Sequence, residues 1–188
     1  MIELLVVVGI IVALASLTAA GLARARRYVR GALLGVQLKS PAFKDGEPLP
    51  TKYSSAGADL SPPLDWTDGP DKTKSFVLIC YDYDMQPKPF AFWLVWNLPP
   101  DRLTLPEGVP RQAELDDPPG TRQGRNSWGA NGLGYRAPPA PPNAHHYSFE
   151  LTALDTMLSL PGGVDEVKLR RAMENHYLSS GSLGALSH

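Results

Sequence analysis

Two aspartates stand at the end of an apolar run, in the order Asp82-Tyr83-Asp84. If the run is a strand, side chains two residues apart point to the same face, so the two carboxylates are expected to lie together. Neighbouring carboxylates can share a proton, bind a hard cation or accept hydrogen bonds from a ligand. The alternative is that they cap a turn before Pro87, and taken alone they favour that structural role.

A second group of polar side chains starts another predicted strand, at His145-His146-Tyr147. The two imidazoles should point to opposite faces, with Tyr147 on the face of His145. An imidazole can donate, accept and carry a charge, so His145 is a candidate pocket residue. A single histidine at a strand end is more often satisfied by its neighbours, and we assign His146 that structural role.

Three apolar segments are predicted to be the central strands that position these side chains. Residues 75–82 are almost continuously apolar, which is typical of a strand buried on both faces. Residues 90–97 form a second strand, and residues 145–154 a third in which apolar and polar side chains alternate. Asp165 can cap a helix over residues 167–176.

Glycine and proline punctuate the chain between these segments, which indicates a mainly β domain with few helices rather than a helical bundle. The stretch from Leu105 to Pro142 is rich in both and has little periodicity. A loop of that length in a compact domain is usually functional or disordered.

The first 36 residues differ from the rest. From Leu4 to Ala23, 20 consecutive residues carry no formal charge, enough at about 1.5 Å per residue to span a membrane as a helix. We therefore expect an anchor over residues 1–36 and a domain over residues 37–188. A cleaved signal peptide is the alternative, but no basic residue precedes the run. The opening residues also resemble the N-terminal helix of type IV pilins, without the basic leader of those proteins.

A basic cluster follows the apolar run, and it predicts a single-pass membrane protein whose domain lies on the cytoplasmic side. The alternative is that these arginines only stop insertion. The cluster consists of Arg24, Arg26, Arg27 and Arg30.

Charge and cysteine content exclude several classes of function. Beyond residue 36 the chain has 18 acidic and 14 basic residues, so it lacks the basic face that binding to nucleic acid requires. Cys80 is the only cysteine, which rules out an internal disulfide and a cysteine-based zinc site. No cofactor or metal is expected.

Sequence blocks across residues 38–186 resemble, in order, those of the phosphatidylethanolamine-binding proteins, and the chain is most similar to their bacterial Raf-kinase-inhibitor-like branch. Each block is weak alone, but their number and order make the resemblance specific. The blocks are Ser40-Pro-Ala-Phe-Lys-Asp-Gly46, Leu49-Pro-Thr-Lys-Tyr53, Ser61-Pro-Pro-Leu-Asp-Trp66, Ser75-Phe-Val-Leu78 with Asp82-Tyr-Asp84, Trp93-Leu-Val-Trp-Asn-Leu-Pro99, Gly124-Arg-Asn-Ser-Trp-Gly129, Gly134-Tyr135, His145-His-Tyr147 with Ala153-Leu-Asp155, and Asn175-His-Tyr-Leu-Ser-Ser-Gly-Ser-Leu-Gly184.

The resemblance implies a central β-sheet packed on a smaller one and a small surface pocket that accepts phosphate or a phosphorylated headgroup. The residues that match the pocket motifs of the family are Asp82, Asp84, Trp93, His145 and Tyr147.

Two departures from the family pattern concern the same pocket. Phe92 stands where the family has a histidine, which removes a hydrogen-bond donor. Arg136-Ala137-Pro138 replaces a Gly-Gly-Pro or Gly-x-Pro loop, and the loss of glycine restricts close approach of a ligand to the main chain. Arg136 can compensate by clamping an anion, or it can fill the pocket and pair with Asp82 or Asp84. Both alternatives remain open.

The leading hypothesis for function is a membrane-tethered, non-catalytic binding or regulatory domain with a small anion pocket. The alternative is an inhibitor of a kinase or a serine protease that acts through its surface and has a vestigial pocket. A hydrolase that uses His145 with the two aspartates is a third possibility, but the chain has no recognised nucleophile or metalloprotease motif.

Overall fold

The structure is a computed structural model that describes residues 35–138 and 143–187. The predicted membrane helix and the basic cluster that follows it lie outside the described residues. In the part of the chain that the structure describes, no helix has the length and apolar character needed to cross a membrane.

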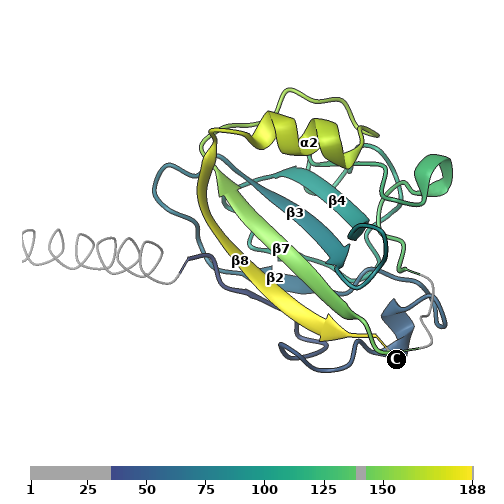
Figure 1. The fold of residues 1–188 in the computed structure, drawn as a ribbon. Coiled ribbons are helices and arrows are strands. Elements are labelled where there is room, and N and C mark those ends of the chain that lie inside the picture. The colour runs from purple at the N-terminus through teal and green to yellow at the C-terminus, as the bar shows by residue number, and fades with distance from the viewer. Residues whose placement is uncertain (1–34, 139–142, 188) are drawn as a thin grey trace, which may run out of the picture.

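Two antiparallel β-sheets form the domain, which confirms the mainly β class with a central sheet and a smaller one (Figure 1). The larger sheet has the strand order β6 (Arg122–Gln123), β4 (Phe90–Leu98), β3 (Ser75–Asp82), β7 (His146–Leu154) and β8 (Tyr177–Leu186). The smaller sheet has the order β1 (Leu38–Lys39), β2 (Leu64–Trp66) and β5 (Thr104–Leu105). Helix α2 (Glu166–Met173) and two 3-10 turns, η1 (Thr51–Tyr53) and η2 (Gly129–Asn131), complete the described elements.

The large sheet is buried on both faces where β3 runs through its centre. All eight residues of β3 are buried, as the continuous apolar run predicts. Phe76, Leu78 and Cys80 face the core shared with the small sheet. Val77 and Ile79 face a second core under α2, which covers the other side of the sheet (Figure 1). The period of two therefore divides one strand between two apolar layers.

Helix α2 begins where the sequence indicates and ends earlier. The side chain of Asp165 accepts a hydrogen bond from the Lys168 N–H at 2.9 Å, which is the predicted N-cap. The helix stops at Met173, and Asn175 adopts a left-handed backbone with φ 66°. His176 therefore lies beyond the helix, where its Nδ1 is 2.8 Å from Asp155 Oδ1. Leu169 and Met173 are buried against the sheet.

Strand β8 was not predicted, because its sequence is rich in serine and glycine and, apart from Tyr177 at its start, lacks the β-branched and aromatic residues that mark a strand. Tertiary contacts stabilise it instead. It pairs with β7 on one side, and on the other the segment 35–49 covers its free edge. The Gly46 N–H donates to the Gly184 carbonyl at 3.0 Å, and the Leu49 N–H donates to Leu186 at 2.8 Å. Strand β6 likewise lies inside the stretch predicted to be a loop.

Gly181 is the position where β8 and the covering segment come closest. A Cβ atom there would lie 1.7 Å from the Val36 carbonyl oxygen, so the backbone of the segment would have to move. We expect Gly181→Ala to lower the free energy of unfolding by about 2 kcal/mol, measured by chemical denaturation.

Gly184→Ala, in the same strand, is the matched control for this prediction. The nearest atom to its added Cβ is the flexible side-chain Oδ1 of Asp45 at 3.2 Å. Gly184→Ala should lower the free energy of unfolding by less than about 1 kcal/mol. Equal losses for the two variants would contradict the steric explanation.

Candidate functional site

The site is centred on Asp82 and His145. Strand β3 ends at Asp82, which lies opposite Tyr147 in the antiparallel pairing with β7. His145 stands two residues before Tyr147 and therefore lies just past the end of β3. His145 Nδ1 is 2.8 Å from Asp82 Oδ2. Asp82 is fully buried and the His145 side chain is 16% exposed. The two groups that the sequence places far apart therefore meet at one end of the large sheet, as predicted.

The Asp82 carboxylate orients the imidazole. Its Oδ2 binds Nδ1 of His145, and its Oδ1 accepts a hydrogen bond from the Asp84 N–H at 3.0 Å. A carboxylate on Nδ1 keeps the proton there and leaves Nε2 for another partner. The partly exposed ring can thus present one nitrogen to a ligand while the other is held from behind.

Tyr147 and Ser187 lie beside this pair. Tyr147 is 3% exposed, and burial, followed by the charge of Asp82, raises its pKa to about 12, against the opposing effect of a hydrogen bond with Ser187. Its phenol therefore stays protonated at neutral pH. The Ser187 hydroxyl accepts a hydrogen bond from the His145 N–H at 2.7 Å. Ser187 was missed by sequence reasoning, because it follows the unpredicted strand β8.

The raised pKa of Tyr147 has a consequence at alkaline pH. A tyrosine in the unfolded chain ionises near pH 10, so between about pH 10 and 12 the unfolded chain releases a proton that the folded protein retains. The stability that this phenol contributes is present below pH 10 and is lost as pH rises to about 12. We expect the free energy of unfolding of Tyr147→Phe to fall less steeply than that of the wild type over this interval.

Denaturant unfolding measured from pH 7 to pH 11.5 checks this expectation. The two curves should run parallel below pH 9, which is the internal control. Tyr53 and Tyr83, whose pKa values are also raised to about 12, should maintain the remaining slope in the variant. Identical slopes above pH 10 would show that Tyr147 contributes nothing to the alkaline transition.

Asp84 and His146 form a second, exposed pair next to the first. Asp84 Oδ2 accepts a hydrogen bond from the main-chain N–H of His146 at 2.7 Å and lies 2.8 Å from His146 Nδ1. These hydrogen bonds, the backbone one foremost, lower the pKa of the Asp84 carboxyl. Strand β3 ends at Asp82, so the expected alternation does not extend to Asp84, and each aspartate has its own histidine. His146 is 75% exposed, in line with a structural role.

The prediction that Trp93 lines the pocket is not what the structure shows. Trp93 is fully buried, and its indole N–H donates to Gln123 Oε1 at 2.8 Å. The pairing of β3 with β4 shifts between Ala91 and Trp93, so Phe92 is an extra residue at a bulge, and Phe92 and Trp93 both pack in the core between the sheets. Phe92 is the one that approaches the site, with its ring centroid 5.5 Å from that of Tyr147.

Arg136 makes a contact that neither alternative included. Its guanidinium carbon is 4.3 Å from the centroid of the Trp128 ring, a cation–π contact, and its Nη1 donates to the Asn131 carbonyl at 3.5 Å. In the part of the chain described, it forms no ion pair with Asp82 or Asp84. The alternative in which Arg136 pairs with Asp82 or Asp84 is therefore wrong, and its role as an anion clamp stays a prediction. Pro138, the other predicted residue of this loop, is buried.

Comparison with protein families gives a match over most of the chain. The model described as phosphatidylethanolamine-binding protein matches residues 39–187. Among individual proteins, a UPF0098 protein of Methanothermobacter thermautotrophicus is 41% identical over 148 residues, which is 79% of this chain and 95% of that protein. A UPF0098 protein of Chlamydia trachomatis is 40% identical over 154 residues, with the same two shares covered.

Solved structures agree with this match. A putative phosphatidylethanolamine-binding protein homologue from Chlamydia trachomatis superimposes with a TM-score of 0.72 at 36% identity and covers 82% of this chain and 97% of its own. YbcL of E. coli is described as a new member of the mammalian PEBP family. It superimposes with a TM-score of 0.72 at 27% identity and covers 82% of this chain and 98% of its own.

Proposed function

Because this chain belongs to the phosphatidylethanolamine-binding protein family, we propose that residues 37–188 form a non-catalytic domain that binds a small anion such as phosphate or a phosphorylated headgroup. The observation that supports this most directly is the contact between His145 Nδ1 and the buried Asp82 carboxylate at 2.8 Å. It holds a partly exposed imidazole by Nδ1, so that Nε2 is the nitrogen that can donate to an anion oxygen when the ring is protonated.

The two aspartates limit how strongly an anion binds. Asp82 and Asp84 each lie 2.8 Å from the Nδ1 of a histidine. When the imidazole of such a pair is protonated, its charge and that of the carboxylate cancel, so the pair has no net charge with which to attract an anion. The phenol of Tyr147 is protonated at neutral pH, 3% exposed and hydrogen-bonded with Ser187, so it adds no charge to the site. With Phe92 where the family has a histidine and Arg136 turned toward Trp128, the site has few charged donors, and we expect weak binding.

The absence of a catalytic role is part of the proposal and rests on how the nucleophilic groups are used. In a serine hydrolase the hydroxyl meets the imidazole nitrogen that faces away from the carboxylate. Here the Ser187 hydroxyl binds the main-chain N–H of His145. Cys80 is completely buried, and burial raises the pKa of its thiol well above the usual value, which suppresses the reactive thiolate.

The proposed tether is the apolar segment Leu4–Ala23, with the arginines behind it favouring the cytoplasmic side. Val36, thirteen residues after the apolar segment ends at Ala23, is buried against β8 and already belongs to the domain. Protease treatment of intact cells should leave the domain undigested. Digestion of the domain from outside would place it on the opposite side.

Calorimetry with inorganic phosphate and with phosphoethanolamine tests the anion site. The full chain should be studied in a polyoxyethylene detergent, which carries neither phosphate nor sugar groups. We expect the wild type to bind at least one of the two anions and His145→Ala to lose that binding. His146→Ala is the matched control, because this neighbouring imidazole is exposed and pairs with Asp84. Binding that survives in His145→Ala, or no binding by the wild type, would refute the proposed site.

A second candidate function, inhibition of a protein partner such as a kinase or a serine protease, is favoured by Phe92. Its ring is fully buried against Tyr147, beside the site, where a smaller or polar residue would leave more room for a ligand. A specific partner that both the wild type and His145→Ala recover in pull-down experiments would select this function over anion binding.

A further inference from the structure

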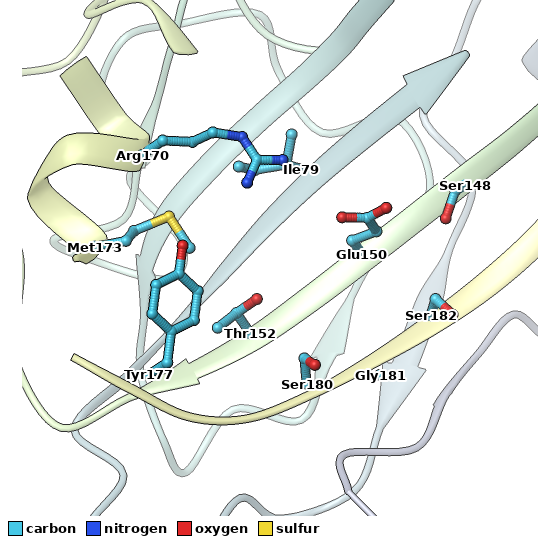
Figure 2. A pocket seen from close by; sticks show the side chains of 10 residues that line it. All are labelled: Ile79, Ser148, Glu150, Thr152, Arg170, Met173, Tyr177, Ser180, Gly181 and Ser182. Carbon is cyan, nitrogen blue, oxygen red and sulfur yellow. The ribbon is translucent and has the colours of Figure 1, made fainter. Parts of the chain in front are cut away.

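A separate hollow of about 420 Å³ lies on the face of the large sheet opposite the Asp82–His145 site. It is enclosed by α2 on one side and by β7 and β8 below (Figure 2). Tyr147 points into the core between the sheets, whereas the next residue, Ser148, lines this hollow, because successive strand residues face opposite ways. Its volume falls in the range of small-molecule sites, about 300–1,000 Å³.

The floor of the hollow is made of hydroxyl groups. Thr152 and Ser180 are paired across β7 and β8, and Ser182 pairs with Glu150. Ser180 and Ser182 are exposed. Hydroxyl groups both donate and accept hydrogen bonds, so this floor matches a ligand whose own groups do both.

Charged groups at the centre are already compensated by the protein. Arg170 reaches from α2 across Ile79 toward the strands, as Figure 2 shows. Its Nε is 3.0 Å from Glu166 Oε1, and its Nη2 donates to the Tyr81 hydroxyl at 2.5 Å. The Glu150 carboxylate accepts a hydrogen bond from the Tyr83 hydroxyl at 2.5 Å.

These charges disfavour ions of either sign in the hollow. An anion would approach Glu150 as well as Arg170, and a cation would meet the guanidinium. A neutral ligand with several hydroxyl groups avoids both repulsions, since it can donate to the carboxylate and accept from the guanidinium.

An exposed aromatic ring completes the arrangement. Tyr177 stands at one end of the hollow beside Met173 in Figure 2, and 51% of it is exposed. An exposed tyrosine gives an apolar, flat surface with a polar tip, suited to the C–H face of a sugar ring. Tyr83, 46% exposed, is a second such residue and is joined to the hollow through Glu150.

From the hydroxyl floor, the balanced charges and the aromatic end, we propose that this hollow is a binding site for a neutral saccharide of one or two sugar units. The site is independent of the proposed anion site, since the two lie on opposite faces of β7. Glu150 and Arg170 bind the ligand's hydroxyl groups, and Tyr177 packs on its ring.

Saturation-transfer NMR and calorimetry with maltose, cellobiose and chitobiose test this site in the full chain, in the same sugar-free detergent. At least one disaccharide should bind with a millimolar or lower dissociation constant. Glu150→Gln removes a charged acceptor with little change in volume, and Tyr177→Ala removes the exposed ring; each should weaken binding about tenfold or more. Glu114→Gln, at an exposed glutamate that faces Arg122, is the control and should bind like the wild type.

The outcomes of this experiment separate the two sites. His145→Ala should retain saccharide binding, and Glu150→Gln should retain phosphate binding, so that failure of one proposal leaves the other standing. Lack of binding by all three disaccharides at 10 mM overturns the saccharide site, as does binding that neither variant weakens. Phosphate or spermidine bound at Glu150 and Arg170 in place of a sugar also overturns it, because a neutral ligand is the core of the inference.

Discussion

The His145→Ala variant is expected to unfold with a free energy about 3 kcal/mol below that of the wild type, in addition to losing the proposed anion site. The alanine leaves Asp82, which is fully buried, with a carboxylate oxygen that has lost its partner. A buried charge without its partner costs roughly 3–5 kcal/mol, and we take the lower value because the imidazole itself is 16% exposed. Chemical denaturation at pH 7 measures the loss.

A double variant distinguishes an uncompensated charge from simple loss of packing. Asp82→Asn combined with His145→Ala removes the carboxylate charge together with its partner, so it should be more stable than His145→Ala alone. His146→Ala, at the exposed neighbouring pair, should cost less than about 1 kcal/mol. If the double variant is less stable than the single one, the Asp82–His145 contact is not what His145 contributes to stability.

Trp93→Ala should lower the free energy of unfolding by about 3–5 kcal/mol, the cost of removing a large aromatic side chain from a closed core. Trp93 is fully buried, and its ring centroid lies 5.4 Å from that of Tyr135. Its N–H also satisfies Gln123 Oε1, while the amide of Gln123 donates to the carbonyls of Pro110 and Gln112. The indole therefore connects the core to the segment that precedes β6.

Trp93→Phe separates the two parts of this effect and tests the role of the residue. It keeps most of the apolar volume but leaves the Gln123 oxygen unpaired, so it should cost about 1–3 kcal/mol. Phosphate affinity should stay within about twofold of the wild type, because Trp93 is buried in the core and its indole N–H bonds with Gln123. A variant of normal stability that no longer binds phosphate would instead make Trp93 a pocket residue.

Several features of the fold follow from sequence patterns. The unbroken apolar run of β3 and the alternation of β7 both predict how each strand is buried, because burial depends on the period of two and needs no knowledge of the partners. Asp165 marks the start of α2 for a similarly local reason, since the cap acts within one turn. The meeting of Asp82 and His145 was predicted through family resemblance, which supplies the pairing of distant strands that pattern alone lacks.

Other features depend on contacts between distant residues. Strand β8 exists because β7 and the segment 35–49 pair with its two edges, and hydrogen bonds between main chains leave no trace in its serine-rich sequence. The bulge at Phe92 turns two consecutive aromatic residues to one face and so removes Trp93 from the site. For Arg136 the sequence left open an anion clamp or an ion pair with Asp82 or Asp84, and in the structure its guanidinium lies over Trp128 without that ion pair.

The β class, the burial of the central strands, the start of the helix and the residue types at the site all depend on local periodicity and chemistry, so they could be predicted from the amino-acid sequence. Which side chains meet depends on how the whole domain packs. The tertiary structure paired each aspartate with its own histidine, brought Ser187 to His145, and formed a hydroxyl-lined hollow from strands β7 and β8 and helix α2. The reason is that strand register, bulges and edge pairing are set by the packing of the whole domain, and a shift of one residue turns a side chain to the opposite face.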